Sequence, residues 1–337
     1  MTSRLINRFR LAKSFLLRQA RSAGLPRMIG IEPTNRCNLQ CIMCPRGQMT
    51  RPLGDMDLAL FQKIIGEGQR YLEFVWLQDM GEPLLHPQFD TMIRYARERG
   101  VRTGISTNAT LLTPAAAERL AASGLDYLMF AFDGSTAQTY ERIRVNARFE
   151  TTLANVRHYL KLKQERRLRT FVVMQSIYMP ETEGEVRDYL RMWRVPGVDA
   201  IRLRQVTYSG NRRGGRFANP RRAGPCLWPW SNPHIKWNGD LVPCCQDADA
   251  SYVLGNLRET SLAELWNSEK MVELRRKLIE GRYAEVPLCS DCNMVQPGRL
   301  AAIASALFHQ FAVNRWVPRV ETWICRLRFR PGRAPKD

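Results

Sequence analysis

The sequence predicts an α/β protein with a parallel sheet, followed by a small cysteine-rich unit. Between residues 28 and 205, short apolar runs alternate with segments of helical periodicity, which is typical of repeated βα units. Five of the nine cysteines lie between residues 225 and 297, after a stretch rich in glycine and arginine. Right-handed βα units close into a full or partial barrel or remain an open sheet, and in either case ligands bind at the carboxyl ends of the strands.

The elements follow one another in a regular order. Strands are predicted at 28–32, 74–77, 102–106, 127–132, 171–176 and 200–203. Helices are predicted between them at 57–66, 88–99, 114–123, 151–166 and 183–193, several of them ending at glycine. We expect a barrel over 28–207, a basic linker over 208–224, a cysteine-rich unit over 225–297 with a helix at 261–280, and a basic tail over 298–337.

Residues 1–27 form a basic amphipathic segment. Helical periodicity over residues 4–21 places arginines opposite an apolar face made of Leu5, Ile6, Phe9, Ala12, Leu16, Leu17 and Ala20. Such a helix either docks on its own domain or lies at a membrane interface.

The composition indicates a globular protein with an anionic partner. The 337 residues are 45% apolar, which is enough for one large domain and a small one. Lys and Arg number 51 against 32 Asp and Glu, for a net charge of +19, and much of the excess lies near the two ends. Nucleic acid, an anionic membrane surface or a phosphorylated substrate would each match this charge.

The N-terminus and the cysteines bear on where the protein works. Arg and Lys interrupt the first residues too often for a secretory signal, and no stretch approaches the roughly 18 apolar residues of a spanning helix. We therefore expect a cytoplasmic protein, with peripheral attachment to the inner membrane surface as an alternative. Clustered cysteines in a reducing compartment are more often metal ligands than disulfides.

A three-cysteine loop, TNRCNLQCIMCPRG, directly follows the first predicted strand. It contains Cys37, Cys41 and Cys44, with no fourth cysteine or histidine nearby. Structural zinc takes four ligands, whereas three thiolates suit a 4Fe-4S cluster with one iron left open. An open iron can bind a cofactor directly.

This loop resembles that of the radical S-adenosylmethionine (SAM) superfamily, whose C-x3-C-x2-C motif follows the first strand of a partial (β/α)6 TIM-like barrel. The resemblance covers residues 29–205. It implies that SAM binds the open iron and that one electron splits it to a 5′-deoxyadenosyl radical, which takes a hydrogen atom from the substrate. It also implies a cofactor pocket made of Gly81, Glu82 and Pro83 for the amino group, Ser106, Thr107 and Asn108 for the ribose and carboxylate, Asp133 and Arg144 along the wall, and Met43 on the adenine.

The second set of cysteines resembles the SPASM or twitch extension of the same superfamily. Cys226, Cys244, Cys289 and Cys292 would hold a second, auxiliary 4Fe-4S cluster, with Cys245 as the alternative to Cys244. Four ligands favour an electron conduit over a substrate-binding cluster. A zinc ribbon-like site is the alternative, because four cysteines with one C-x2-C pair also suit tetrahedral zinc.

These features predict a radical SAM oxidoreductase, similar to a dehydrogenase, supplied with electrons by a flavodoxin or ferredoxin. No peptide-recognition unit precedes Cys37, so we expect a small carbohydrate-like or lipid-linked substrate; proton-handling residues are not assigned. The alternatives are a peptide or protein maturase, a redox-neutral epimerase or rearrangement enzyme, and a zinc-bearing nucleic-acid-binding protein. Nucleic acid is the least favoured partner, and it would contact Arg202, Arg204, Arg212, Arg213 and Arg216.

Overall fold

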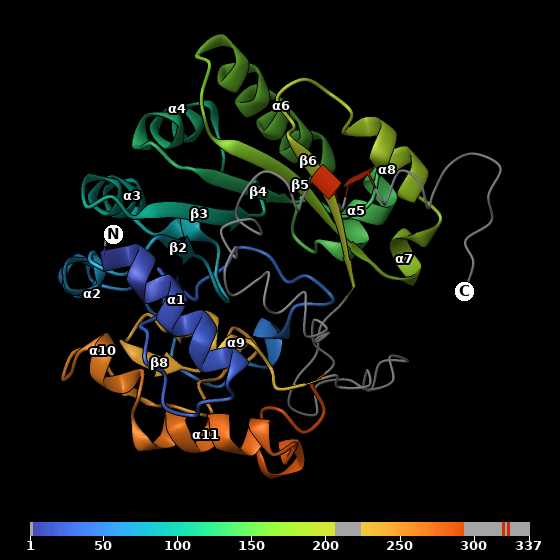
Figure 1. Ribbon diagram of the computed structural model, residues 1–337. Coiled ribbons are helices and arrows are strands. Elements are labelled where there is room, and N and C mark those ends of the chain that lie inside the picture. Colours follow the sequence, from blue (N-terminus) through green and yellow to red (C-terminus); the bar gives the residue numbers. More distant parts are fainter. Residues whose placement is uncertain (1–2, 206–223, 293–318, 321, 324–337) are drawn as a thin grey trace.

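A nine-stranded sheet organises the protein in the computed structural model, which describes residues 3–205, 224–292, 319, 320, 322 and 323 (Figure 1). The strand order is β6-β5-β4-β3-β2-β1-β7-β8-β9. All pairs from β6 to β7 are parallel, and β7, β8 and β9 pair antiparallel. The strands are β1 (Met28–Ile31), β2 (Phe74–Leu77), β3 (Arg102–Thr107), β4 (Tyr127–Ala131), β5 (Phe171–Tyr178), β6 (Ala200–Gln205), β7 (His234–Ile235), β8 (Asp240–Val242) and β9 (Gly255–Asn256). The prediction of an α/β fold with a partial barrel of six parallel strands is confirmed.

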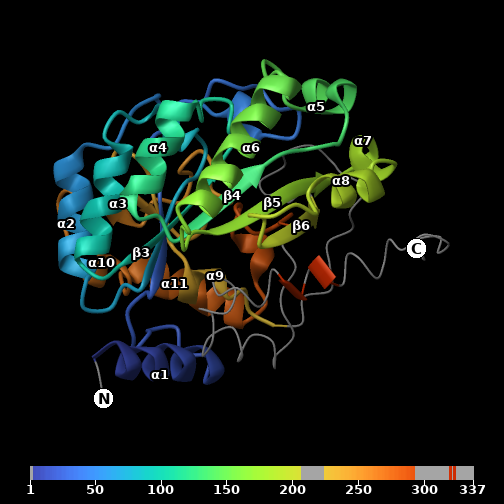
Figure 2. The same cartoon turned by 90° about the horizontal axis from the view of Figure 1, so that it is seen from above.

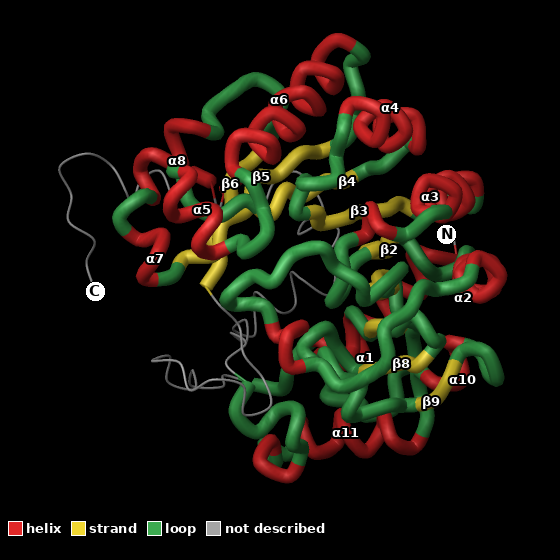
Figure 3. Tube along the Cα trace, turned by 180° about the vertical axis from the view of Figure 1, so that it is seen from behind, coloured by secondary structure: helices red, strands yellow, loops and turns green. Residues whose placement is uncertain are grey.

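Helices cover the outer side of the parallel strands, as Figure 3 shows for α3, α4 and α6. Both faces of the strands are therefore buried, which explains why their sequences are almost continuously apolar. The helices are α1 (Ser3–Leu16), α2 (Leu58–Gly68), α3 (Phe89–Glu98), α4 (Pro114–Ser123), α5 (Ala137–Ile143), α6 (Phe149–Glu165), α7 (Pro180–Glu183), α8 (Val186–Met192), α9 (Trp228–Ser231), α10 (Leu262–Leu265) and α11 (Glu269–Ile279), with 3-10 turns η1 (Pro45–Gln48), η2 (Pro83–Leu85) and η3 (Tyr283–Glu285).

Local capping explains where the helices differ from the prediction. The helix predicted at 261–280 is two helices, because Ser268 ends the first segment and caps α11 by accepting a hydrogen bond from the Met271 N–H. The helix predicted at 183–193 divides into α7 and α8 around Gly184. Helix α5, capped by Thr136, was not predicted.

Helix α1 docks on its own chain across the start of β2 and β3. The Arg4 guanidinium donates to the carbonyls of Gln69 (2.7 Å) and Gly100 (3.0 Å), and Arg8 pairs with the buried carboxylate of Glu73. The docked face differs from the predicted apolar face: Leu11 and Phe15, which are not part of the predicted face, are buried, whereas its members Ile6, Phe9 and Leu17 are exposed. The reason is that backbone carbonyls and a carboxylate satisfy the arginines on the docked face. The predicted helix over 4–21 also ends early, at Leu16.

The cysteine-rich unit continues the sheet of the barrel through β7, which pairs with β1. Gly30 of β1 lies opposite both Trp76 of β2 and His234 of β7. A β-carbon at Gly30 would lie 2.2 Å from the imidazole of His234, so only glycine fits there. Below the strands, the Arg275 side chain of α11 is buried between two tryptophans, and its burial lowers the pKa of Arg275 to about 9.

Two predicted segments fall largely outside the described residues. These are the basic linker 208–224, apart from Gly224, and the basic tail 298–337, apart from four residues near 320; Arg212, Arg213 and Arg216 are among those not described. Within the described chain, no helix is both long and apolar enough to cross a membrane.

Candidate cluster and cofactor site

The three-cysteine loop lies at the carboxyl end of β1 and is held by the backbone of a neighbouring connection. The N–H groups of Gln40 and Ile42 donate to the carbonyls of Val145 and Ile143 at 3.1 and 3.0 Å. Cys37 and Cys41 are half-buried and Cys44 is exposed. The loop is therefore fixed on one side while its third thiol faces outward.

Side-chain N–H groups approach two of the three sulfurs. Asn108 Nδ2 lies 4.0 Å from Cys37 Sγ, and Arg144 Nη1 lies 3.7 Å from Cys41 Sγ. Burial raises the pKa of both thiols, and the Arg144 charge opposes this rise at Cys41. Because metal ligands are thiolates, these two donors stabilise the form of the cysteines that can hold a cluster.

The segment after β2 is pressed against the cysteine loop. A β-carbon at Gly81 would lie 2.1 Å from the carbonyl oxygen of Thr34, so glycine is required for this close approach. The buried Glu82 carboxylate accepts bonds from Thr107 Oγ1 (2.7 Å) and the Leu84 N–H (3.2 Å) at Oε1, and from the Asn108 N–H (2.8 Å) at Oε2. Burial raises the pKa of Glu82 despite these bonds. Oε2 keeps one acceptor position, which an amino group could use.

Asp133 and Arg144 form the opposite wall. Arg144 Nε and Nη2 donate to Asp133 Oδ2 at 2.7 and 2.6 Å, and the Ile177 N–H donates to Oδ1 at 2.6 Å. Met43 packs beside Ile177 in a small apolar cluster that also contains Ile143 and Met179. This cluster offers the thioether to a flat ring.

The residues predicted for the cofactor thus meet at one end of the sheet. Glu82 bonds to Thr107 and Asn108, Asn108 reaches Cys37, and Arg144 reaches Cys41. Pro83 begins the η2 turn behind Glu82, and Ser106 is half-buried near the end of β3. This arrangement fits a 4Fe-4S cluster with SAM at its open iron: thiols with N–H donors on one side, and a buried carboxylate with a vacant lone pair on the other.

The second cysteine set gathers in the C-terminal unit. The buried Cys244 thiol, which follows β8, is close enough to Cys226 and Cys289 for their charges to act on it. Burial raises the pKa of Cys244, and the neighbouring sulfurs of Cys245, Cys226 and Cys289 add to this rise in that order. The Cys226 N–H donates to Tyr283 Oη at 3.0 Å, which ties the start of the unit to its end. Cys292 lies three residues beyond Cys289, where this described stretch ends.

The adjacent Cys245 also lies near charged side chains. Its neighbours are Asp79, Lys236 and Arg204, and burial and the Asp79 charge raise the pKa of Cys245 to about 12. Cys226 and Cys289 act on Cys244, whereas the charged groups that act on Cys245 are Asp79, Lys236 and Arg204. Within the described residues, no three Cys, His, Asp or Glu side chains are arranged around a single metal ion. A cluster binds each thiolate at a different iron, so its ligands stand farther apart than those of one zinc ion.

A buried polar group between the two cysteine sets was missed by the sequence prediction. Lys236 Nζ lies 2.5 Å from Asp79 Oδ2, and these side chains are 0% and 1% exposed. His234 Nδ1 lies 3.6 Å from the same oxygen. Burial would raise the pKa of Asp79, but the charges of Lys236 and His234 outweigh it and lower the pKa to about 2. The only signal in the sequence is the alternation His-Ile-Lys ahead of the turn at Asn238-Gly239.

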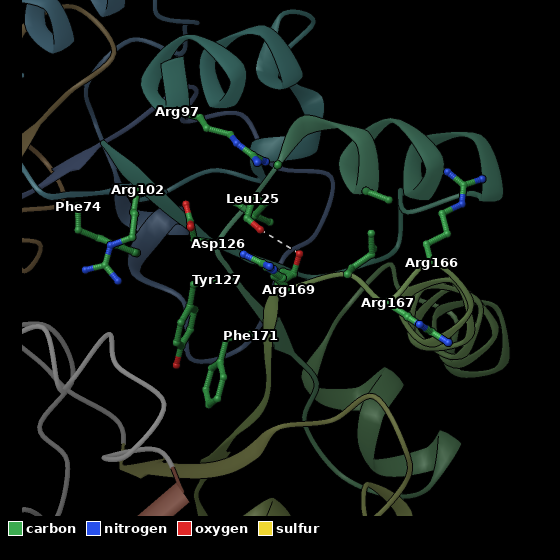
Figure 4. Close-up of a pocket in the computed structure, with 14 residues that line it drawn as sticks. Phe74, Arg97, Arg102, Leu125, Asp126, Tyr127, Arg166, Arg167, Arg169 and Phe171 are labelled. Carbon is green, nitrogen blue, oxygen red and sulfur yellow. Dashed lines mark hydrogen bonds between the residues drawn. The ribbon is translucent and has the colours of Figure 1, made fainter. Parts of the chain in front are cut away.

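A cavity of about 450 Å³ lies elsewhere, at the amino ends of β3, β4 and β5 (Figure 4). Its lining includes Arg102, Asp126, Tyr127 and Phe171. None of the predicted cofactor residues lines this cavity, so it is separate from the cluster site.

Known proteins resemble this chain over both of its units. Residues 31–192 match the radical SAM superfamily, and residues 226–293 match the SPASM iron-sulfur cluster-binding domain. The chain is 27% identical to the tungsten-containing aldehyde ferredoxin oxidoreductase cofactor-modifying protein of Pyrococcus furiosus, over 78% of this chain and 86% of that protein. It is 24% identical to the S-adenosyl-L-methionine-dependent 2-deoxy-scyllo-inosamine dehydrogenase of Niallia circulans, over 80% and 93%.

Solved structures share the fold. BtrN in complex with AdoMet and 2-DOIA has a TM-score of 0.56 at 20% identity and covers 80% of this chain and 94% of its own. Native anSMEcpe with bound AdoMet has a TM-score of 0.62 at 12% identity, over 86% and 99%. Radical SAM enzymes use a 4Fe-4S cluster and SAM, and SPASM domains bind auxiliary iron-sulfur clusters. The chain therefore belongs to the radical SAM superfamily and carries a C-terminal SPASM iron-sulfur domain.

Proposed function

We propose that the protein is an oxidoreductase that converts an alcohol carbon of a small polar substrate to a carbonyl. Cys37, Cys41 and Cys44 would hold the cluster that binds SAM, and the second cysteine set would hold the auxiliary cluster. When bound, cluster and cofactor supply the carbon radical that removes a hydrogen atom from the substrate. A flavodoxin or ferredoxin would supply the electron that this cleavage consumes.

The observation that carries this proposal is the Asp79–Lys236–His234 group, which lies beside Cys245 and hence next to the auxiliary cysteines. Oxidation of an alcohol requires that the carbon lose a hydrogen atom, the hydroxyl lose a proton and the remaining electron leave. Asp79 Oδ1 is buried with no hydrogen-bond partner in the described structure, so it can accept a hydrogen bond from the substrate hydroxyl group. Asp79 would hold the hydroxyl through this hydrogen bond, His234 would take the proton, and the auxiliary cluster would take the electron.

The same region supports a substrate rich in hydroxyl or amino groups. Gln78 Oε1, Asp79 Oδ1 and Asn232 Oδ1 are all buried acceptors without a partner in the described part of the chain. Buried acceptors are normally hydrogen-bonded, so a ligand that donates several bonds would explain them. A carbohydrate-like or lipid-linked compound has this chemistry, and the relative from Niallia circulans is named for such a substrate.

Peptide or protein maturation is the second candidate. A stretch of 130 residues, 39% of this chain, is 32% identical to the mycofactocin maturase MftC of Mycobacterium tuberculosis, and the structure of SuiB bound to the precursor peptide SuiA shares the fold with a TM-score of 0.60. The first of these matches covers only 33% of the maturase, so it bears on a part of that protein alone.

Anaerobically reconstituted protein tests the proposal. With SAM and a reductant it should form 5′-deoxyadenosine, and the Cys37→Ala, Cys41→Ala, Cys44→Ala triple variant should form none. A panel of polyols, amino-cyclitols including 2-deoxy-scyllo-inosamine, and peptides would then be searched for a product lighter by two hydrogen atoms. A product of unchanged mass would establish a redox-neutral reaction instead, and an oxidised peptide would establish the second candidate.

The His234→Gln variant tests the assignment of the proton acceptor separately. It should still cleave SAM, but its yield of oxidised product should fall by about 100-fold or more, because general base catalysis contributes at least that much. An unchanged yield would show that His234 does not take the proton.

We also propose a cytoplasmic location with peripheral attachment to an anionic membrane surface. The excess of Lys and Arg supports this attachment.

A further inference from the structure

We propose that the amino-terminal end of the barrel docks on an anionic phospholipid membrane, with the outer face of α1 entering the interface and an arginine-lined cavity taking lipid phosphate groups. The outer face of α1 consists of Ile6, Phe9, Arg10, Lys13 and Leu17. The arginine cavity is the cavity of about 450 Å³ that Figure 4 shows. This inference deepens the proposed attachment and does not depend on the reaction.

The outer face of α1 presents apolar side chains to solvent. Ile6, Phe9 and Leu17 are 40%, 53% and 60% exposed and fall within about three helical turns. Isolated exposed apolar residues are common on protein surfaces, but a row of them along one helix marks an interaction site.

This face cannot turn inward, because the opposite face is already fixed. Leu11 and Phe15 are buried, Asn7 Nδ2 donates to the Leu25 carbonyl at 2.9 Å, and Arg4 and Arg8 bond to the barrel. The exposed row therefore persists in the folded protein and is free to bind a partner.

The charges on the outer face fit a membrane better than an apolar protein surface. Lys13 is exposed between the apolar side chains, and Arg10 is exposed beside them. Their methylene stems can lie along the acyl boundary while the charged ends reach the phosphates, as in helices that lie in the interface.

The arginine cavity supplies a second, independent anion site. Five arginines line it, Arg97, Arg102, Arg166, Arg167 and Arg169, against the single carboxylate of Asp126. Figure 4 shows Arg97, Arg102 and Arg169 extending from three separate segments around Asp126, whereas Arg166 and Arg167 point outward. Arg166 also pairs with Glu118 at 2.6 Å, so the positive charge that faces the cavity comes from Arg97, Arg102 and Arg169.

Arg102 shows the clearest need for an anion. Its Nη2 is buried with no hydrogen-bond partner in the described structure, and burial lowers the pKa of Arg102. A nearby phosphate would satisfy this nitrogen and stabilise the charge. Asp126 already accepts the Thr103 N–H at 3.0 Å, so it is partly engaged in holding β3.

Both features lie at the same end of the barrel. Helix α1 bonds to carbonyls that precede β2 and β3, and the arginine cavity opens at the starts of β3, β4 and β5. Figure 2 shows α1 outside the sheet, on the side away from α5 and α6. The cluster site is at the carboxyl ends, so docking would leave it open to an electron donor.

Vesicle co-sedimentation of the reconstituted full chain tests the proposal. The protein should bind vesicles of phosphatidylcholine containing one-third phosphatidylglycerol, should bind pure phosphatidylcholine at least tenfold more weakly, and should dissociate as salt rises. An Ile6→Ser, Phe9→Ser variant should bind the anionic vesicles at least tenfold more weakly. A Leu53→Ser, Val195→Ser variant, which removes comparably exposed apolar side chains elsewhere, should bind normally.

The cavity is tested by Arg97→Gln with Arg169→Gln. Each basic residue near an anionic surface contributes about fivefold to partitioning, so the double variant should bind about 25-fold more weakly. Arg142→Gln with Arg148→Gln, on α5 and just beyond it, is the matched control and should bind normally. Equal binding to neutral and anionic vesicles would overturn the proposal, as would normal binding by the Phe9 variant. If the protein binds inorganic pyrophosphate in the cavity but does not bind vesicles, the cavity is a site for a soluble phosphate and membrane docking is overturned.

Discussion

Replacing Lys236 by Met should destabilise the protein far more than the loss of an ordinary ion pair. Lys236 and Asp79 are 0% and 1% exposed and 2.5 Å apart, so the substitution leaves the Asp79 carboxylate buried without its main counter-charge. Breaking a buried pair from one side costs about 3–5 kcal/mol of unfolding free energy, whereas replacing both members by uncharged groups costs much less. The Asp79→Asn, Lys236→Met double variant should therefore be more stable than Lys236→Met alone.

The pair also predicts a dependence of stability on pH. The pKa of Asp79 in the folded protein, about 2, lies below its value of 3.8 in the unfolded chain. A carboxyl group whose pKa is lower in the folded protein than in the unfolded chain stabilises the fold at pH values above its unfolded pKa. This contribution, about 2 kcal/mol, is lost as the pH falls from about 4 toward 2. The Asp79→Asn variant should not show this component of acid destabilisation.

Anaerobic urea unfolding followed by tryptophan fluorescence measures both effects. Lys277→Met is the matched control: its pair with Glu285 has partners that are 24% and 52% exposed, so the variant should lose less than about 1 kcal/mol. The reasoning is refuted if Lys236→Met is as stable as this control, or if the costs of the two single substitutions simply add in the double variant.

Three other substitutions test the site. Cys244→Ala should reduce the iron content from about eight to about four per chain, whereas Cys245→Ala should keep all of it; the reverse result would exchange their roles. Gly81→Ala should abolish 5′-deoxyadenosine formation, because its β-carbon collides with a carbonyl of the cysteine loop, whereas Gly47→Ala, which meets nothing within 4 Å, should leave it unchanged. Arg144→Lys should keep its iron but cleave SAM at least tenfold more slowly, because lysine cannot hold Asp133 through two nitrogens; a normal rate would show that this pair does not shape the pocket.

Sequence motifs located the parts of the site that follow successive parallel strands. Cys37, Glu82 and Asn108 could be placed together because the carboxyl ends of neighbouring strands meet at one edge of a sheet. The Asp79–Lys236 pair could not be found in this way, because its members are 157 residues apart and β7 is only two residues long. Hydrophobic periodicity identifies a strand only when the strand is longer than this.

The error over α1 has a different cause. Hydrophobic periodicity assigns a buried face from apolar residues alone, but here Arg4 and Arg8 lie on the docked face because carbonyls and Glu73 receive them. The face assigned from apolar residues alone is therefore not the face that docks on the barrel. Apolar and basic residues are mixed on both faces of this helix. That mixture could have indicated a helix that contacts its own domain on one face and another partner on the other.

The pairing of β7 with β1 makes the SPASM domain an extension of the barrel's own backbone ladder. Its position relative to the first cysteine loop is consequently fixed by strand register. A chimaera that joins this domain to another radical SAM barrel would need a residue without a side chain opposite the imidazole of His234, as Gly30 provides here.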